Sequence, residues 1–218
     1  MIPMRRIAVL ISGRGSNLAA LLQAEAAGAL GGSIVLVISN RADAAGLAVA
    51  RAHGCATAVI EHAGRDRPAF EAEISSALER NGCDLTVLAG FMRIFTAAFV
   101  ARHAGRLINI HPSLLPSFPG LETHRRALED GVRIHGCTVH FVTAALDHGP
   151  IIAQAALAVQ AEDDASTLAK RVLTLEHQLL PRAVRAWCED RLVIAGASVR
   201  VKGESASASV LQVPRLYA

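Results

Sequence analysis

Residues 7–17 of the chain read IAVLISGRGSN, a short apolar run that leads directly into a turn rich in glycine. An uninterrupted apolar run such as residues 7–11 is typical of a strand that is buried on both faces of a parallel sheet. After the turn, residues 16–27 repeat their apolar side chains with helical spacing. This succession of strand, tight turn and helix predicts the first unit of an α/β fold.

The same alternation continues through the first half of the chain. Strands are expected at residues 34–38, 56–60, 85–89 and 107–110, and helices near residues 44–53, 68–80 and 96–103. Continuous apolar strands separated by amphipathic helices predict a doubly wound, mostly parallel sheet with helices on both faces, a Rossmann-like arrangement.

The second half departs from this alternation. Residues 136–143 and 151–159 have no helix between them and predict a hairpin-like pair on the same sheet, whereas residues 123–129 predict a short helix. A long helix is expected over residues 163–188, capped by Asp164 or Ser166. We expect residues 1–195 to form a single α/β domain and residues 196–218 a C-terminal tail, with strand-like runs at 192–195 and 198–201.

Composition and charge exclude several classes of protein. Of the 218 residues, 52% are hydrophobic and 19% charged, which argues against intrinsic disorder. The net charge of +3 is scattered and aromatic residues make up 4%, so we expect small phosphorylated or carboxylated substrates and no nucleic-acid partner. No uncharged stretch is long enough to span a bilayer and no signal peptide is recognised, so we expect no membrane partner and a cytoplasmic location. The four cysteines lack metal-binding spacing, and no metal is expected.

The turn at residues 12–17 suits a phosphate group. Its glycines let backbone N–H groups face a ligand, and the following helix adds partial positive charge at its N-terminus. The turn is not a P-loop and lacks the third glycine of the dinucleotide fingerprint, which favours a phosphate monoester over a nucleoside triphosphate or NAD. The alternative is a tight turn without a ligand, in which Ser16 caps the helix.

The segment NIHPSLLP at 109–116, which contains Asn109, His111 and Ser113, lies at the carboxyl end of the fifth predicted strand, where open α/β sheets form their ligand crevice. Because side chains alternate along a strand, Asn109 and His111 are expected to point to the same face. An amide beside an imidazole can bind a developing oxyanion, and a protonated histidine can donate a proton. Asp147 follows the next strand, where it would stabilise a His111 imidazolium or merely begin a turn.

Several short motifs occur in order along the chain: GSN at 15–17, AGFMRI at 89–94, NIHPSLLP at 109–116, PG at 119–120, HFV at 140–142 and D-x-GP at 147–150. Together they resemble the phosphoribosylglycinamide formyltransferase family of folate-dependent de novo purine biosynthesis, over roughly residues 5–195. The resemblance implies a formyltransferase fold and an enzyme that acts on small molecules, as a monomer or homodimer.

By this resemblance, the amine of 5-phosphoribosylglycinamide attacks the formyl carbon of the co-substrate 10-formyltetrahydrofolate, giving formylglycinamide ribonucleotide and tetrahydrofolate. Asn109 and His111 would bind the oxyanion, with His111 donating a proton. Asp147 would keep His111 protonated and help to remove the proton from the attacking amine. An α-amine with a pKa of about 8 is already a nucleophile near neutral pH, so no covalent enzyme intermediate is needed.

The resemblance also implies binding roles. Gly15, Ser16 and Asn17 would take the substrate phosphate, and Glu176 would contact its ribose or glycinamide part. The folate pocket would be lined by Arg67, Met92, Arg93, Ile94, Phe95, Asn109, Thr143, Ala144, Ala145, Leu146 and Asp147. His140 is expected to be a buried structural residue. Two residues depart from the family's pattern: Glu122 stands where some relatives have histidine, and Arg14 replaces a small polar residue of the phosphate turn.

Other functions fit parts of this pattern. Methionyl-tRNA formyltransferases and formyltetrahydrofolate deformylases share the catalytic core but normally carry an extra domain, for which the chain length leaves little room. A non-catalytic α/β module that binds a phosphate ligand is a further alternative, in which Asn109, His111 and Asp147 are structural.

Overall fold

A parallel sheet forms the centre of the structure, a computed structural model that describes residues 4–203. Its strands are β1 (Arg5–Ile11), β2 (Gly32–Ser39), β3 (Ala56–Val59), β4 (Leu85–Leu88) and β5 (Leu107–His111), paired in the order β3-β2-β1-β4-β5. The apolar run of β1 contributes side chains to two hydrophobic cores, because Ile7 and Val9 face one side of the sheet while Ala8 and Leu10 face the other. Burial on both sides explains why the run shows no polar alternation.

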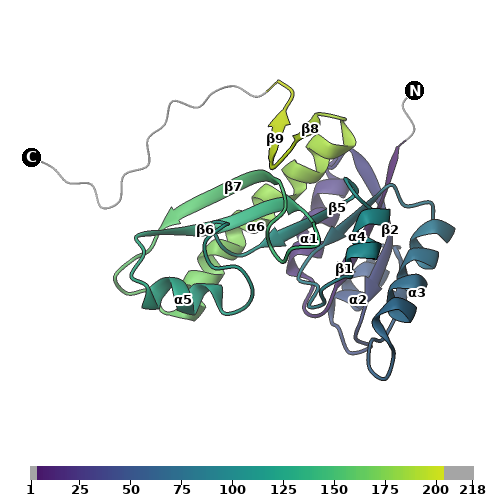
Figure 1. Ribbon diagram of the computed structural model, residues 1–218, viewed down its shortest axis with the longest axis horizontal. Helices are drawn as coiled ribbons and strands as arrows, with labels where there is room; N and C mark the ends of the chain where they lie inside the picture. The colour runs from purple at the N-terminus through teal and green to yellow at the C-terminus, as the bar shows by residue number, and fades with distance from the viewer. Residues whose placement is uncertain (1–3, 204–218) are drawn as a thin grey trace, which may run out of the picture.

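Helices cover both faces of the sheet (Figure 1). The core on one face includes α1 (Ser16–Ala26), α2 (Gly46–Ala52) and α6 (Ala165–Cys188), and the core on the other includes α3 (Arg67–Arg80) and α4 (Ala97–Arg102). The short helix α5 (Thr123–Glu129) lies against α6. The predicted doubly wound α/β fold is therefore confirmed.

Antiparallel strands extend the sheet beyond β5. β6 (Ile134–Phe141) pairs antiparallel with β5, and β7 (Ile151–Ala158) pairs antiparallel with β6, which confirms the predicted hairpin-like pair. The runs predicted at 192–195 and 198–201 form the strands β8 (Leu192–Ala195) and β9 (Ser198–Val201), and β9 joins β7 at its first residue. The sheet thus includes residues beyond 195, whereas residues 204–218 of the expected tail lie outside the described part of the chain.

The strand order creates a crevice at one edge of the sheet. From β1 the chain continues outward through β2 and β3, and then crosses to β4 on the other side of β1, so that the loops after β1 and β4 diverge. Ser12 ties these loops together: its N–H donates to the Gly90 carbonyl (3.1 Å), and its hydroxyl accepts from the Met92 N–H (2.8 Å) and donates to Asn40 (2.6 Å).

The helix that follows β1 begins without a side-chain cap. Gly15 occupies the capping position with φ of 77°, in the left-handed region, and a Cβ there would come within 2.6 Å of the Gly46 Cα. The alternative in which Ser16 caps α1 is wrong, because Ser16 is the first residue of the helix itself. Within residues 4–203, no side chain caps the N-terminus of α1, so its first N–H groups lack a side-chain acceptor at the cap.

At α6, Asp164 rather than Ser166 is the cap, accepting a hydrogen bond from the Thr167 N–H at 2.7 Å. The acidic residue also suits the partial positive charge of this helix end. Among the helices of residues 4–203, none combines the length and apolar character needed to cross a membrane.

Replacing Leu21 by alanine tests the core between α1 and the sheet. Leu21 is fully buried, so Leu21→Ala should lower the free energy of unfolding by about 2–5 kcal/mol, measured by urea denaturation. The matched control is Val59→Ala in β3, where the side chain is 40% exposed and the change should be within about 0.5 kcal/mol. Equal losses in the two variants would contradict this assignment of the core.

Candidate active site

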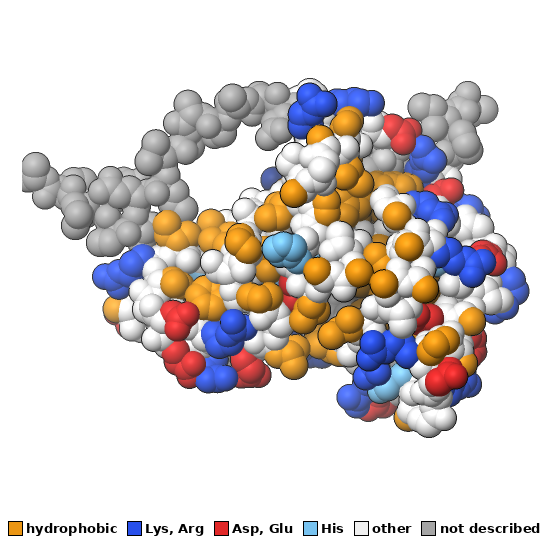
Figure 2. All heavy atoms as spheres, in the orientation of Figure 1, with side chains coloured by type: hydrophobic (Ala, Val, Ile, Leu, Met, Phe, Trp, Pro, Cys, Tyr) orange, Lys and Arg blue, Asp and Glu red, His pale blue; other side chains and the backbone are white. Residues whose placement is uncertain are grey.

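A pocket with a volume of about 740 Å³ opens where β4, β5 and β6 end. Hydrophobic side chains gather in the middle of the molecular face shown in Figure 2, between α5 and the end that carries α3 and α4, while Lys and Arg lie toward its periphery. Four large side chains at the mouth of the pocket are more than half exposed: Met92, Ile94, Leu121 and Leu146. Such an apolar rim around a concave site favours a ligand with flat apolar surface.

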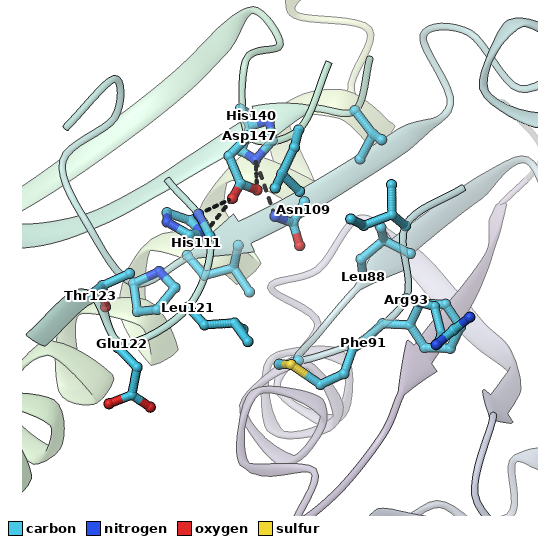
Figure 3. A pocket seen from close by; sticks show the side chains of 18 of the residues that line it. Leu88, Phe91, Arg93, Asn109, His111, Leu121, Glu122, Thr123, His140 and Asp147 are labelled. Carbon is cyan, nitrogen blue, oxygen red and sulfur yellow. Dashed lines mark hydrogen bonds and ion pairs between the residues drawn. The ribbon is translucent and has the colours of Figure 1, made fainter. Parts of the chain in front are cut away.

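His111 is the last residue of β5 and contacts oxygen acceptors through both ring nitrogens (Figure 3). Its Nε2 lies 2.9 Å from the Phe118 carbonyl oxygen, and its Nδ1 lies 3.5 Å from Oδ2 of Asp147. A carbonyl can only accept, so Nε2 carries a proton. The Asp147 carboxylate lies beside Nδ1, and the side chains of His111 and Asp147 are only 7% and 9% exposed.

Asp147 reaches His111 because of the turn that follows β6. Its backbone adopts φ of 50°, and its Oδ2 accepts a hydrogen bond from the Gly120 N–H at 2.8 Å. The turn closes tightly onto the end of β6, since a Cβ on Gly149 would lie 1.6 Å from the Phe141 carbonyl oxygen. Only glycine fits at position 149. The Asp147 carboxylate is thus positioned both by this tight turn and by the Gly120 N–H.

Asn109 lies two residues before His111 on the same face of β5, as predicted, and its amide is oriented by His140. The Nδ1 of His140 donates to the Phe141 carbonyl (2.9 Å), so its Nε2 accepts from the Asn109 amide nitrogen (3.1 Å). Burial lowers the pKa of His140, which keeps this ring neutral and able to accept. The second N–H of the Asn109 amide is left for a ligand.

The expectation that His140 is buried is confirmed, but its contact with Asn109 was not predicted. The two residues are partners in the β5–β6 register, which spacing along the chain does not reveal. His140 Nε2 also lies 4.0 Å from Oδ1 of Asp147.

A second polar pair lines the pocket, one side chain from the first turn of α1 and the other from the middle of α6. The Asn17 amide nitrogen donates to Oε2 of Glu176 at 2.6 Å, although the two residues are 159 positions apart. Both side chains are buried, and burial raises the pKa of the Glu176 carboxyl. Oδ1 of Asn17 is buried without a hydrogen-bond partner in the described part of the chain, so a ligand donor would satisfy it.

Most of the expected site residues line this one pocket. They are Asn17, Met92, Arg93, Ile94, Phe95, Asn109, His111, Thr143, Ala144, Ala145, Leu146, Asp147 and Glu176. Figure 3 shows Arg93 across the cavity from Asn109, His111 and Asp147.

Three expected residues do not line the pocket. Gly15 and Ser16 lie in the turn immediately before Asn17, and Arg67 is exposed at the first position of α3. Of the two departures from the family's pattern, Arg14 is exposed in the phosphate turn. Glu122 lies at the pocket wall, where it forms a 3.2 Å ion pair with Arg125.

Two histidines support the pocket wall beside His111. Nδ1 of His124 lies 3.2 Å from Nε2 of His135, and burial lowers the pKa of both rings, that of His135 to about 4. Within residues 4–203, no group of three or more His, Cys, Asp or Glu side chains is arranged to hold a metal ion.

Comparisons with known proteins all identify formyl transferases or enzymes that act on formyltetrahydrofolate as similar to this chain. Residues 5–184 match the formyl transferase family. The chain is 48% identical over 187 residues to phosphoribosylglycinamide formyltransferase of Escherichia coli (strain K12), covering 85% of this chain and 88% of that protein. The crystal structure of glycinamide ribonucleotide transformylase 1 from Symbiobacterium toebii is 48% identical, with a TM-score of 0.90 over 92% of this chain and 95% of that chain. A formyltetrahydrofolate deformylase from Pseudomonas syringae pv. tomato is 30% identical, with a TM-score of 0.86 over 92% of this chain and 66% of that chain.

The neutral state of His135 should make stability depend on pH. An unfolded histidine has a pKa of about 6.5, so the unfolded chain binds more protons than the folded chain as the pH falls from there toward 4. The free energy of unfolding should therefore decrease over this range, and less steeply in His135→Gln than in the wild type. Chemical denaturation at several pH values measures the slope. His53→Gln, at an exposed histidine, is the control, and an unchanged slope in His135→Gln would refute the prediction.

Proposed function

The chain belongs to the formyl transferase family, and we propose which of its residues carry out each part of the reaction. It is an enzyme of purine biosynthesis that transfers the formyl group of 10-formyltetrahydrofolate to the amine of 5-phosphoribosylglycinamide. The observation that carries the assignment of residues is the convergence of Asn109, His111 and Asp147 at one wall of the pocket.

His111 is proposed to act as the general acid. Its Nε2 proton is engaged by the Phe118 carbonyl, whereas the 3.5 Å from Nδ1 to Asp147 is longer than a well-formed hydrogen bond. The Nδ1 proton is therefore the one that a substrate atom can share. As the amine adds to the formyl carbon, this proton is donated to the tetrahedral intermediate, with Asp147 beside the ring. When the intermediate collapses, the bond between the formyl carbon and N10 of the folate breaks, and tetrahydrofolate leaves with a proton on that nitrogen.

Asn109 is proposed to bind the oxyanion of the tetrahedral intermediate. Its amide is already held by His140, so little reorganisation is needed when charge develops on the formyl oxygen. Asp147 has a second proposed role, because the attacking amine must lose a proton as the C–N bond forms. A carboxylate beside the intermediate can take that proton through a water molecule.

The amine substrate is proposed to bind at the α1 and α6 side of the pocket. Gly15, Ser16 and Asn17 would hold its phosphate through the uncapped N-terminus of α1. The Asn17–Glu176 pair lies next to this turn and offers acceptors for a ribose hydroxyl or an N–H group of the glycinamide part.

The co-substrate is proposed to bind against residues 92–95 and 143–147. Both segments line the pocket and supply most of its exposed apolar rim. Arg67 is exposed outside the lining, so contact with it would require the folate to extend beyond the mouth. The cytoplasmic location and the choice between monomer and homodimer remain predictions from the sequence.

Hydrolysis of 10-formyltetrahydrofolate is the second candidate reaction, because the deformylase structure has the same fold. Asn109, His111 and Asp147 alone would promote attack on the formyl carbon by water as well as by an amine. The Asn17–Glu176 pair favours the transferase, since it adds a polar subsite that a water molecule does not need.

An assay of tetrahydrofolate release with and without 5-phosphoribosylglycinamide separates these reactions. We expect release that requires the amine acceptor and yields formylglycinamide ribonucleotide. Equal release without the acceptor would instead identify a deformylase. No release in either mixture would favour a non-catalytic module.

Substitutions at the catalytic cluster test the assigned roles. His111→Ala and Asp147→Asn should lose turnover with little loss of stability, and Asn109→Ala should lower kcat on the order of 10²–10³-fold, the usual effect of removing an oxyanion donor. Steady-state kinetics and thermal unfolding measure both quantities. Arg80→Ala, at an exposed position at the end of α3 and outside the pocket, is the control for kcat. Near-normal rates in the cluster variants would refute the mechanism even if the activity is present.

A further inference from the structure

The ring of His111 depends on the loop that follows it. This loop, residues 113–118, ends at Phe118, whose carbonyl oxygen accepts the His111 Nε2 proton at 2.9 Å. The Ser113 hydroxyl donates to the Ser117 carbonyl at 2.6 Å and lies 3.2 Å from the Phe118 carbonyl, closing the loop on itself. Any displacement of the loop would therefore move the acceptor that orients the ring.

Two side chains from neighbouring strands hold this loop from outside. Thr138 of β6 is opposite His111 in the sheet register, and Gln154 of β7 is opposite Thr138. Directly opposite residues share a face of the sheet, so His111, Thr138 and Gln154 form one row across three strands. The loop lies against this row.

The Thr138 hydroxyl has every hydrogen-bonding position filled. It donates to the Ser113 carbonyl (2.7 Å) and accepts from the Leu115 N–H (3.0 Å) and from Nε2 of Gln154 (2.9 Å). A hydroxyl offers one donor and two acceptor positions, and all three are used. Thr138 is fully buried, so water cannot replace it.

Gln154 completes the network from the other side. Its amide nitrogen donates to the Leu115 carbonyl at 2.8 Å as well as to Thr138. Both protons of the amide are thus committed, and the loop backbone is held at Ser113 and at both polar groups of Leu115. Gln154 itself is exposed, so its role can be tested without opening the core.

We propose that Thr138 and Gln154 are positioning residues for the formyl transfer. They fix residues 113–118 so that the Phe118 carbonyl holds His111 with its Nδ1 proton directed at the substrate. This positioning role rests on the function proposed for His111. It differs from a purely structural role because it affects the chemical step more than substrate binding.

The test compares Thr138→Val and Gln154→Leu with Thr138→Ser, which keeps the hydroxyl, and with Gln160→Leu, which replaces another exposed glutamine just beyond β7. For each protein, kcat, the KM of both substrates, the pH–rate profile and the thermal midpoint are measured. We expect Thr138→Val and Gln154→Leu to lower kcat on the order of 10–100-fold, as small misplacements of catalytic groups do, with both KM values nearly unchanged. Thr138→Ser and Gln160→Leu should keep kcat near the wild-type value.

The pH profile gives a readout that a structural role would not move. Loosening the Phe118 carbonyl removes the acceptor that orients the Nε2 proton of His111, so the dependence of kcat on pH should differ from that of the wild type in Thr138→Val and Gln154→Leu. Should Thr138→Val fail to fold, Gln154→Leu decides the question.

Failure of the positioning role can be distinguished from failure of the proposed function. Folded variants with wild-type kcat and pH profile would overturn the positioning role while leaving the transferase intact. A wild-type enzyme without formyl transfer, or an active His111→Ala variant, would instead overturn the function proposed for the site. A fall in kcat that is equal in Gln160→Leu would also overturn the positioning role.

Discussion

The site depends on the contact between the His111 ring and the Asp147 carboxylate. The two side chains are almost fully buried, and charges removed from water are stable only when their remaining hydrogen-bonding groups are satisfied. The structure meets this condition with backbone atoms: the Phe118 carbonyl accepts from the ring, and the Gly120 N–H donates to the carboxylate. Both backbone groups belong to one stretch of loop, so the conformation of that loop determines whether the pair can exist.

Backbone strain is concentrated around this pair. Among the described residues, the non-glycine positions with positive φ are Phe118, Glu122, Asp147 and Asp190, and the first three lie in the loops around the pocket. Such conformations cost free energy and persist when surrounding contacts compensate. Here the compensation includes the Thr138–Gln154 network beneath the loop and the close fit of Gly149 against β6. The antiparallel strands β6 and β7 therefore complete the site as well as extend the sheet.

The sequence predicted features that depend on local periodicity. The apolar runs of β1 to β5 and the helices between them follow directly from residue spacing, and so does the shared face of Asn109 and His111. Contacts set by strand register or turn conformation were not predictable in the same way. The neighbours of Asn109 and His111 on β6 are His140 and Thr138 because of one particular antiparallel register. The Asp147 contact needs a positive φ, which no local pattern specifies. The alternative cap at Ser16 is absent because the left-handed Gly15 takes the capping position, so the helix begins one residue earlier, at Ser16.

The choice between an amine and water as the nucleophile is made away from the catalytic cluster. In the proposed mechanism, His111, Asn109 and Asp147 stabilise charge on the formyl carbon's substituents, and this stabilisation is the same for either nucleophile. Specificity must then come from groups that bind only the amine substrate. We propose that the Asn17–Glu176 pair meets this requirement, since Oδ1 of Asn17 is a buried polar atom without a hydrogen-bond partner among residues 4–203, and hydrolysis by water would not use it. A substrate that satisfies this group gains binding energy that brings its amine to the formyl carbon, so proximity rather than a stronger catalytic group separates transfer from hydrolysis.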